Sequence, residues 1–236
     1  MINSSVQPLS PSLSPLVPRG ERESSRAMVV VSRRCAPLDS PRLTRYKCAV
    51  QRRWPWLVPL FLIPVGIILG WRYYHWRDHR FDAVILAAAR RYGVEPALVK
   101  AVVWRESWFN PDARGSSQEF GLMQIRAAAA QEWAQAEKLK TFSPQQLLDP
   151  GTNTLAGAWY LAKLLKRHQQ TDNPLPYALA DYNAGRTRAL KWDKGAAATN
   201  SAAFLERIDF PGTRKYVRTV LRRYEHYRPV FSEENR

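Results

Sequence analysis

Residues 99–107 read Val99-Lys-Ala-Val102-Val103-Trp-Arg-Glu106-Ser107. Positions 99, 102, 103 and 106 are spaced i, i+3, i+4 and i+7, so they share one face of a helix. Three of them are valines and the fourth is Glu106, a carboxylic acid at the end of an apolar face. An acid held against apolar side chains has its charged form disfavoured, which raises its pKa and lets it donate a proton near neutral pH. The alternative is an ordinary Glu at a helix C-terminus that points into water.

Helical periodicity continues around this stretch, from about residue 78 to residue 226. Strand-like alternation is scarce, and the Gly/Ser-rich residues 112–120 indicate a loop. Residues 143–146 resemble a capping box, with Pro144 at a first-turn position. The expected helices cover residues 80–93 closed by Gly93, a segment opened by Pro96, residues 126–138, residues 152–168, a segment from Pro174 or Pro176 to Gly185, and residues 214–226. The predicted fold class is therefore all-α, with one compact helical domain.

The composition of the 236 residues favours an anionic setting without naming a partner. The chain holds 36 Lys and Arg against 20 Asp and Glu, a formal charge of +16. Such a charge suits nucleic acid, acidic lipid or a cell-wall polymer, and equally a solvated surface. Because no basic cluster, zinc-finger or RNP-type pattern is present, we expect no nucleic-acid partner. The two cysteines, Cys35 and Cys48, precede the helical region, and no group of side chains has metal-ligand spacing.

The N-terminal quarter divides into a polar and an apolar part. Residues 1–53 are rich in Pro, Ser and Arg, which predicts a disordered basic segment; a translation start at Met28 is an alternative. Residues 54–71 carry no charge and are flanked by aromatic residues, so we predict a single transmembrane helix over residues 54–74. A cleaved signal peptide and a buried core helix are the competing interpretations.

Charge on either side of the apolar run sets the expected orientation. Seven Lys and Arg lie in residues 33–53 and five in residues 72–91, which favours a cytoplasmic N-terminus. The helical domain is then expected in the periplasm, anchored to the inner membrane. The predicted organisation is a basic segment 1–53, a span 54–74, a catalytic domain 78–228 and a C-terminal tail 229–236.

Three further clusters follow Glu106. They are Gly121-Leu-Met-Gln124, Asp181-Tyr-Asn-Ala-Gly185 and Gly212-Thr-Arg-Lys-Tyr-Val217. Each alone has a structural explanation, as a turn, a helix C-cap or a core aromatic residue. All of them together, in this order, indicate one active site.

The four clusters resemble the signature blocks of the soluble-lytic-transglycosylase (SLT) catalytic domain. The matching blocks are Glu106-Ser107-x-Phe109-Asn110-Pro111, Gly121-Leu-Met-Gln124, Tyr182-Asn-Ala-Gly185 and Thr213-Arg-x-Tyr-Val217. The resemblance covers roughly residues 80–228. It implies a goose-type, lysozyme-like helical fold. It also implies an enzyme that cleaves peptidoglycan glycan strands between N-acetylmuramic acid and N-acetylglucosamine and leaves 1,6-anhydromuramoyl ends.

The resemblance also implies roles for single residues. Glu106 matches the catalytic acid/base, and Ser107 follows it as in the family's Glu-Ser pair. Gln124 is expected to line the cleft near the acid. Tyr182 and Asn183 match the family's binding block. Tyr216, in turn, matches the tyrosine that closes over the site. No metal or organic cofactor is implied, and no residue pattern names an envelope protein as partner.

One acid suffices for this chemistry, although a conventional glycosidase needs two carboxylates. Asp112, Glu119 and Asp181 do not follow an apolar stripe, so Glu106 is the one candidate from the pattern. The substrate's N-acetyl group can stabilise the anomeric carbon and its 6-hydroxyl can attack. The alternatives are a hydrolytic muramidase on the same fold and a wall-binding component of an envelope-spanning apparatus.

The chain departs from the usual signature at several positions. Gly115 stands where many members have Ser, with Ser116 next to it. The usual Gly-Ala appears as Gln118-Glu119, and Asp181 precedes the Tyr-Asn pair in place of Ala. Gly212 replaces the Glu that commonly precedes Thr-Arg. These departures leave Glu106 unchanged.

Overall fold

Helices dominate the computed structural model, which describes residues 57–233. The α-helices are α1 (Leu57–His79), α2 (Asp82–Tyr92), α3 (Pro96–Ser107), α4 (Ala127–Ala136), α5 (Pro150–Arg167), α6 (Pro174–Ala184), α7 (Arg186–Trp192), α8 (Ser201–Arg207) and α9 (Pro211–Glu233). Two short 3₁₀ helices, η1 (Pro144–Leu148) and η2 (Gly195–Ala198), lie between them. The strands are β1 (Glu119–Phe120) and β2 (Ile125–Arg126), which pair antiparallel with Glu119 opposite Arg126.

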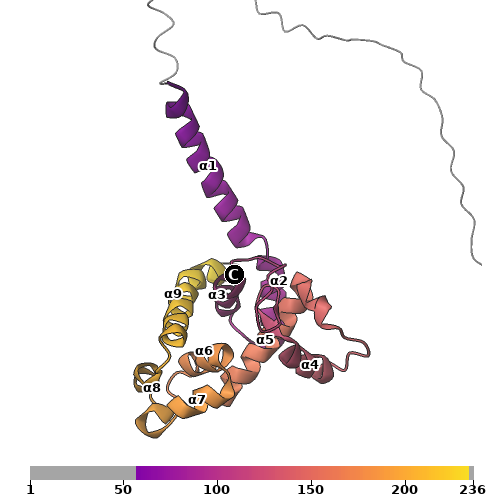
Figure 1. The fold of residues 1–236 in the computed structure, drawn as a ribbon, viewed down its shortest axis with the longest axis vertical. Coiled ribbons are helices and arrows are strands. Elements are labelled where there is room, and N and C mark those ends of the chain that lie inside the picture. Colours follow the sequence, from indigo (N-terminus) through magenta and orange to yellow (C-terminus); the bar gives the residue numbers. More distant parts are fainter. Residues whose placement is uncertain (1–56, 234–236) are drawn as a thin grey trace, which may run out of the picture. The chain divides into compact units, whose positions relative to one another are not determined.

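The helix that carries Glu106 forms the centre of the packing. Helix α3 packs against α9 along much of its length, α2 packs against α5, and α6 lies between α5 and α9 (Figure 1). Val99, Val102 and Val103 of α3 are fully buried in the core. The i, i+3, i+4 pattern read from the sequence therefore describes the buried face of α3, and the all-α prediction is confirmed in its main feature.

Local signals place most helix ends where the sequence predicted them. Gly93 ends α2 in the left-handed conformation at φ 65°, which a residue without Cβ adopts at little cost. Pro96 and Pro174 occupy first-turn positions of α3 and α6. The Gln146 side chain accepts a hydrogen bond from the Ser143 amide at 3.1 Å, as a capping box requires.

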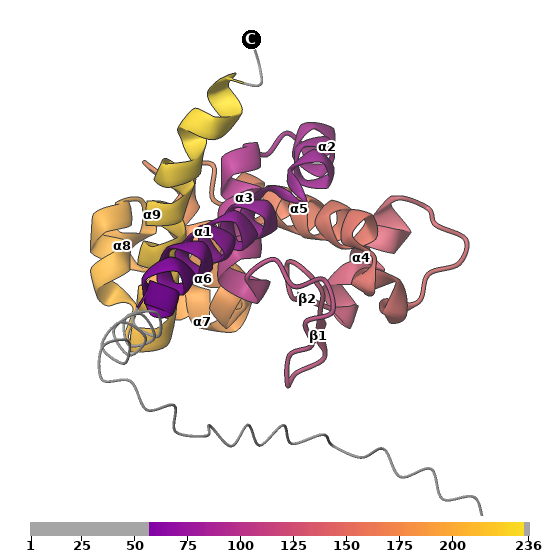
Figure 2. The same ribbon diagram turned by 90° about the horizontal axis from the view of Figure 1, so that it is seen from above.

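Some elements were not predicted. Helices α7, α8 and η2 follow Gly185, in a stretch that the periodicity left unassigned. The hairpin β1–β2 falls at the end of the expected polar loop and projects from the helices around it (Figure 2). The last helix continues to Glu233, and Phe231, in the predicted C-terminal tail, is buried.

Helix α1 overlaps the predicted transmembrane segment. Its apolar side chains are exposed, among them Leu60, Phe61, Ile67 and Leu69. Between residues 57 and 233, no helix is both long and apolar enough to cross a bilayer. Residues 54–56 of the predicted span, and the whole basic segment 1–53, lie outside the described residues. The membrane span therefore stays a prediction.

A buried lysine joins α1, α2, α3 and α9. The Lys100 side chain on α3 is fully buried, and its Nζ lies 2.7 Å from Asp82 Oδ1 and 3.5 Å from Asp78 Oδ2. Tyr227 donates a hydrogen bond to Asp78 at 2.6 Å, and its ring faces the lysine at 4.8 Å. A buried charge is tolerated only when it is paired, so this network fixes the N-terminal half of α3 to its neighbours.

Replacing this lysine should destabilise the domain. Lys100→Met leaves Asp78 and Asp82 without their buried cation, a change that costs about 3 kcal/mol or more in the free energy of unfolding. Denaturant unfolding of the purified domain measures it. Lys163→Met, which removes a lysine from a partly exposed pair with Glu132, is the control and should change stability by less than about 1 kcal/mol. Equal stability of the two variants would contradict the role of Lys100.

Candidate active site

Glu106 is the last-turn acid of α3, directly after the buried valine face. Its side chain is part-buried and is contacted by Tyr216 of α9. The Tyr216 hydroxyl donates a hydrogen bond to Glu106 Oε1 at 2.6 Å, and its side chain is only 1% exposed. Because α3 and α9 pack closely, two residues 110 positions apart are held in contact.

The environment of Glu106 shifts its pKa in the direction that an acid catalyst needs. Burial raises the pKa from 4.5 to about 7, against the opposing effects of the Tyr216 hydrogen bond and the Arg105 charge. The negative charge of Glu119 adds to the upward shift. Near neutral pH a large fraction of Glu106 is therefore protonated and able to donate a proton.

A cavity of about 220 Å³ opens at Glu106. The side chains and backbone that line it come from α3, the β1–β2 hairpin, α4, α5 and α6. They are Glu106, Glu119, Gln124, Ile125, Arg126, Ala129, Tyr160, Tyr182, Asn183 and Gly185. This catalytic cleft mixes aromatic rings with amide and charged groups, which suits a sugar with apolar ring faces and polar substituents.

The loop from Gly121 to Gln124 is fixed by a buried asparagine. Asn153 of α5 accepts a hydrogen bond from the Met123 amide and donates to the Phe120 and Leu147 carbonyls, each at 2.7 Å. Gly121 has φ 70°, and a Cβ there would lie 2.3 Å from the Asn153 amide nitrogen. Only glycine fits this position, so the Gly-Leu-Met-Gln block is a tightly seated turn.

Gln124, at the end of that turn, presents an acceptor to the cleft. Its Nε2 donates to the Ala113 carbonyl at 3.1 Å and to the Gly121 carbonyl at 2.9 Å. Both amide hydrogens are used by the backbone, which leaves the Oε1 lone pairs for a partner. The structure thus brings Gln124 beside Glu106, where the sequence placed it.

Tyr182 and Asn183 form the opposite wall. The Tyr182 hydroxyl donates to the Met123 carbonyl at 2.7 Å, and its ring lies 5.6 Å from the Tyr160 ring. Asn183 accepts a hydrogen bond from the Thr213 hydroxyl at 2.9 Å through Oδ1, so its amide nitrogen is left to donate. Burial and the nearby Glu106 charge raise the pKa of Tyr182 and of Tyr216 well above the ordinary value.

Ser107 and Tyr216 do not line the cavity. The Ser107 hydroxyl donates to the Val103 carbonyl at 3.2 Å, one turn back along α3. Tyr216 reaches the site only through its hydrogen bond to Glu106. Of the six residues singled out from the sequence, Glu106, Gln124, Tyr182 and Asn183 line the cleft, Tyr216 supports the acid from behind, and Ser107 faces its own helix.

Asp181 supports the wall from inside the domain. Its fully buried side chain lies 2.7 Å from Arg167 and 3.7 Å from Arg186, with His168 at 3.6 Å. Burial alone would raise the pKa of Asp181, but the neighbouring His168, Arg167 and Arg186 outweigh it and hold the pKa below its ordinary value. This network anchors the end of α6, where Tyr182 and Asn183 lie.

Sequence reasoning missed Glu119, Arg126, Tyr160 and Asn153. Glu119 was dismissed because no apolar stripe leads to it, yet it lines the same cleft as Glu106. Arg126, its cross-strand partner, contacts its carboxylate at 3.0 Å through Nη2. The presence of Glu and Arg on either side of the Gly-Leu-Met-Gln turn was a signal in the sequence, since a tight turn places its flanking residues opposite each other.

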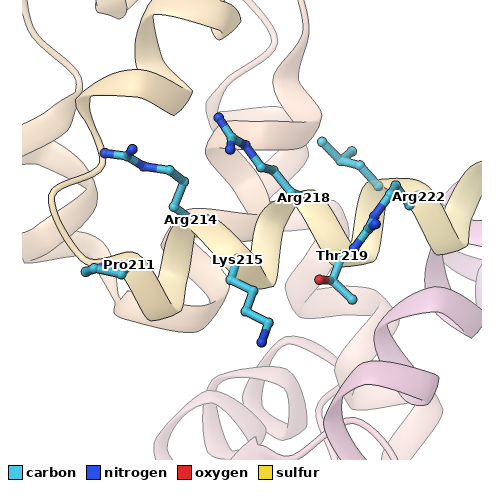
Figure 3. Close-up of a pocket in the computed structure, with 7 residues that line it drawn as sticks. Pro211, Arg214, Lys215, Arg218, Thr219 and Arg222 are labelled. Atoms are coloured by element: carbon cyan, nitrogen blue, oxygen red, sulfur yellow. The ribbon is translucent and has the colours of Figure 1, made fainter.

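A larger hollow of about 670 Å³ lies along α9, away from the acid. Its lining residues all belong to α9 and are Pro211, Arg214, Lys215, Arg218, Thr219, Leu221 and Arg222. Arg214 and Arg218 extend to the same side of α9 and Lys215 to the other (Figure 3), and both arginines pair with Glu206. No carboxylate lines this hollow, so it offers no acid chemistry. In residues 57–233, no group of three or more His, Cys, Asp and Glu is placed to hold a metal ion.

The fold agrees with comparisons to known proteins. Residues 83–205 match the family described as the transglycosylase SLT domain. The chain is 36% identical over 157 residues to a soluble lytic murein transglycosylase of Escherichia coli, covering 64% of this chain and 24% of that protein. It is 35% identical over 121 residues to membrane-bound lytic murein transglycosylase C of Shigella sonnei, covering 49% and 34%.

A solved structure has a similar fold. The chain is similar to the lytic transglycosylase Slt from Pseudomonas aeruginosa, solved as an inactive mutant, with a TM-score of 0.59 and 30% identity. That match covers 65% of this chain and 24% of the other. The protein therefore belongs to the transglycosylase SLT domain family. It spans about a quarter to a third of the length of these relatives.

The buried acid should make stability depend on pH in a defined direction. The pKa of Glu106 is raised from 4.5 to about 7 in the folded protein. The free energy of unfolding of the wild-type protein should therefore fall as the pH rises through this range, because the carboxylate anion is less favourable in the folded state than in water. Glu106→Gln is neutral at every pH. The two proteins should unfold with equal free energy near pH 4, and the variant should be more stable by up to about 3 kcal/mol at pH 8. A difference that does not change between pH 4 and pH 8 would contradict the raised pKa.

Proposed function

We propose that this protein is a peptidoglycan lytic transglycosylase. The observation that carries the proposal is the part-buried carboxyl of Glu106 at the end of α3, which the Tyr216 hydroxyl contacts and which faces a cleft lined by aromatic and amide side chains. Membership of the SLT family supports the substrate class, and the E. coli and S. sonnei relatives are named as murein transglycosylases.

The proposed reaction uses one carboxyl group twice. Glu106 donates its proton to the oxygen that leaves with N-acetylglucosamine, as the bond from this oxygen to the muramoyl C1 breaks. The muramoyl N-acetyl group stabilises the positive charge at C1. The 6-hydroxyl oxygen then bonds to C1 and gives its proton to Glu106, which restores the acid. No water is consumed, and the product carries a 1,6-anhydro ring.

The other site residues receive roles that match their free hydrogen-bonding groups. Gln124 accepts and Asn183 donates, so the two amides are suited to the N–H and C=O of the acetamido groups. Tyr182 offers its ring face to a sugar, because its hydroxyl is already bonded to Met123. Tyr216 holds Glu106 in place. Ser107, whose hydroxyl bonds within α3, is proposed to support the helix end beside the substrate.

A hydrolytic muramidase is the second candidate, and Glu119 is the observation that favours it. A hydrolase would use a second carboxylate in the cleft as nucleophile or as base for water. The Glu119 carboxylate accepts hydrogen bonds from the Ser117 amide at 2.9 Å and from Arg126 at 3.1 Å, one on each oxygen. An acid whose two oxygens are both engaged is poorly placed for either task, so the transglycosylase is preferred.

The cellular setting is also a proposal. The uncharged run in residues 54–71 and the exposed apolar side chains of α1 support an anchor in the inner membrane, with the catalytic domain in the periplasm. Membrane-bound relatives exist within the same family. A role as a wall-binding component of an envelope apparatus, independent of catalysis, is the alternative that a catalytic variant separates.

Product analysis tests the reaction. The wild-type protein should release fragments with anhydromuramoyl ends from purified sacculi, as measured by mass spectrometry, and a hydrolase would release reducing ends. Glu106→Gln should lower the rate about 10²–10⁴-fold without loss of fold. If that variant fully restores the phenotype of a deletion strain, catalysis is not the biological role.

Truncation tests the domain boundary and the anchor. A fragment of residues 78–236 keeps Asp78 and Phe231, so it should fold, remain active and leave the membrane fraction on cell fractionation. A matched fragment of residues 78–228 lacks the buried Phe231 and should be less stable, by about 3 kcal/mol for a fully lost Phe side chain. Unfolding of the longer fragment would contradict a domain that begins at residue 78.

A further inference from the structure

The hairpin beside Glu106 contains a feature that the usual SLT signature lacks. Glu119 on β1 and Arg126 on β2 are paired across the two strands, and both line the catalytic cleft. Arg126 contacts Glu119 Oε1 through Nε at 3.1 Å and through Nη2 at 3.0 Å. The Ser117 amide donates to Oε2 at 2.9 Å. The Glu119 carboxylate is therefore held in one place by two hydrogen bonds, one on each oxygen, and by the ion pair with Arg126.

The space for this carboxylate exists because residue 115 is glycine. A Cβ at Gly115 would lie 2.3 Å from Glu119 Oε2, and 3.0 Å from both Glu119 Cβ and Gln124 Oε1. The Gly115 amide also donates to the Glu119 carbonyl at 2.8 Å. Two departures from the common signature, Gly115 and Glu119, thus occupy one small volume. The carboxylate fills the place that a side chain at residue 115 would take.

The charge of Glu119 acts on Glu106. Among the groups that face Glu106, Tyr216 of α9 and Arg105 of α3 lower its pKa, whereas burial and the Glu119 charge raise it. Tyr182 of α6, with Tyr160 of α5 behind it, completes the surroundings of the acid and is neutral near pH 7. Glu119 is the one carboxylate among the groups that shift the pKa of Glu106.

We propose that Glu119, held by Arg126 and by the Ser117 amide, is a positioning residue of this site that acts on the reaction through Glu106. The inference rests on the proposed function, since it concerns the acid step of that reaction. A negative charge near Glu106 favours its protonated form and opposes loss of its proton to water. The same charge favours the positive anomeric carbon that develops as the glycosidic bond breaks. Arg126 keeps the carboxylate in the wall of the cleft, out of contact with C1.

The test compares the pH dependence of the cleavage rate on sacculi for wild type, three single variants and one double variant. Glu119→Gln keeps the shape but removes the charge, so the fall in rate at high pH should move by about half a pH unit toward lower pH. That shift corresponds to about threefold less activity at pH 8. Glu206→Gln, on α8, removes the same charge from an exposed ion pair with Arg218 and should leave the profile unchanged.

Gly115→Ser gives a second way to displace the carboxylate. The nearest atom to the new Cβ is the end of the flexible Glu119 side chain, so the variant can fold with that side chain moved aside. Its profile should shift in the same direction as that of Glu119→Gln, and the double variant should shift no further than Glu119→Gln alone.

The outcomes separate this inference from the proposed function. All variants should still produce anhydromuramoyl ends, and absence of these ends from the wild-type digest overturns the function itself. Anhydro products with an unmoved profile in Glu119→Gln overturn the role of Glu119. Equal shifts in Glu119→Gln and Glu206→Gln also overturn it, because they would reflect net charge alone.

Discussion

Contact between α3 and α9 brings the hydroxyl of Tyr216 to the part-buried carboxyl of Glu106, and the site depends on this one arrangement. The buried valines of α3 hold this helix in the core, and this fixes the direction in which the Glu106 side chain leaves the helix. Tyr216 then orients the acid with a 2.6 Å hydrogen bond, while burial keeps its pKa near 7. The protein supplies a positioned proton, and in the proposed reaction the substrate supplies the remaining groups.

The supporting groups follow from the same arrangement. Asn153 fixes the turn that carries Gln124, and Asp181 fixes the end of α6 that carries Tyr182 and Asn183. Both are fully buried polar residues whose partners lie on neighbouring elements of the fold. Each satisfies backbone or charged groups that would otherwise be costly inside the domain, and each places a cleft residue. Asn153 and Asp181 therefore both stabilise the domain and position residues of the cleft.

The fold could be predicted from the sequence where the signals are local. The valine spacing of α3, Gly93 after α2 and the Ser143–Gln146 cap each depend on residues within a few positions, and the structure bears them out. The hairpin could not be found, because two-residue strands have no period to detect. Helices α7 and α8 are seven residues each, too short for a convincing amphipathic pattern. The burial of Phe231 could not be predicted from its neighbours in sequence, because its ring contacts Lys100, far away in the chain.

The site, like the fold, could be predicted only where its residues stand close together in the sequence. Glu106, Gln124, Tyr182 and Asn183 stand in contiguous blocks that resemble a known family, and they do meet in one cleft. Glu119 was not given a role in the site, because its importance arises from three-dimensional neighbours, namely Arg126, Ser117 and the space that Gly115 leaves for its carboxylate. The sequence indicates the pairing with Arg126 across the Gly-Leu-Met-Gln turn, but the contacts with Ser117 and Gly115 are visible only once the chain is folded.

The most direct test of this account is a titration of Glu106 itself. Carbon-13 NMR of the side-chain carboxyl in the wild-type protein, assigned by its loss in Glu106→Gln, follows the protonation of this one group with pH. The account predicts a midpoint near pH 7, more than two units above an exposed glutamic acid. A midpoint near 4.5 would show an ordinary solvated carboxylate and would contradict the central claim.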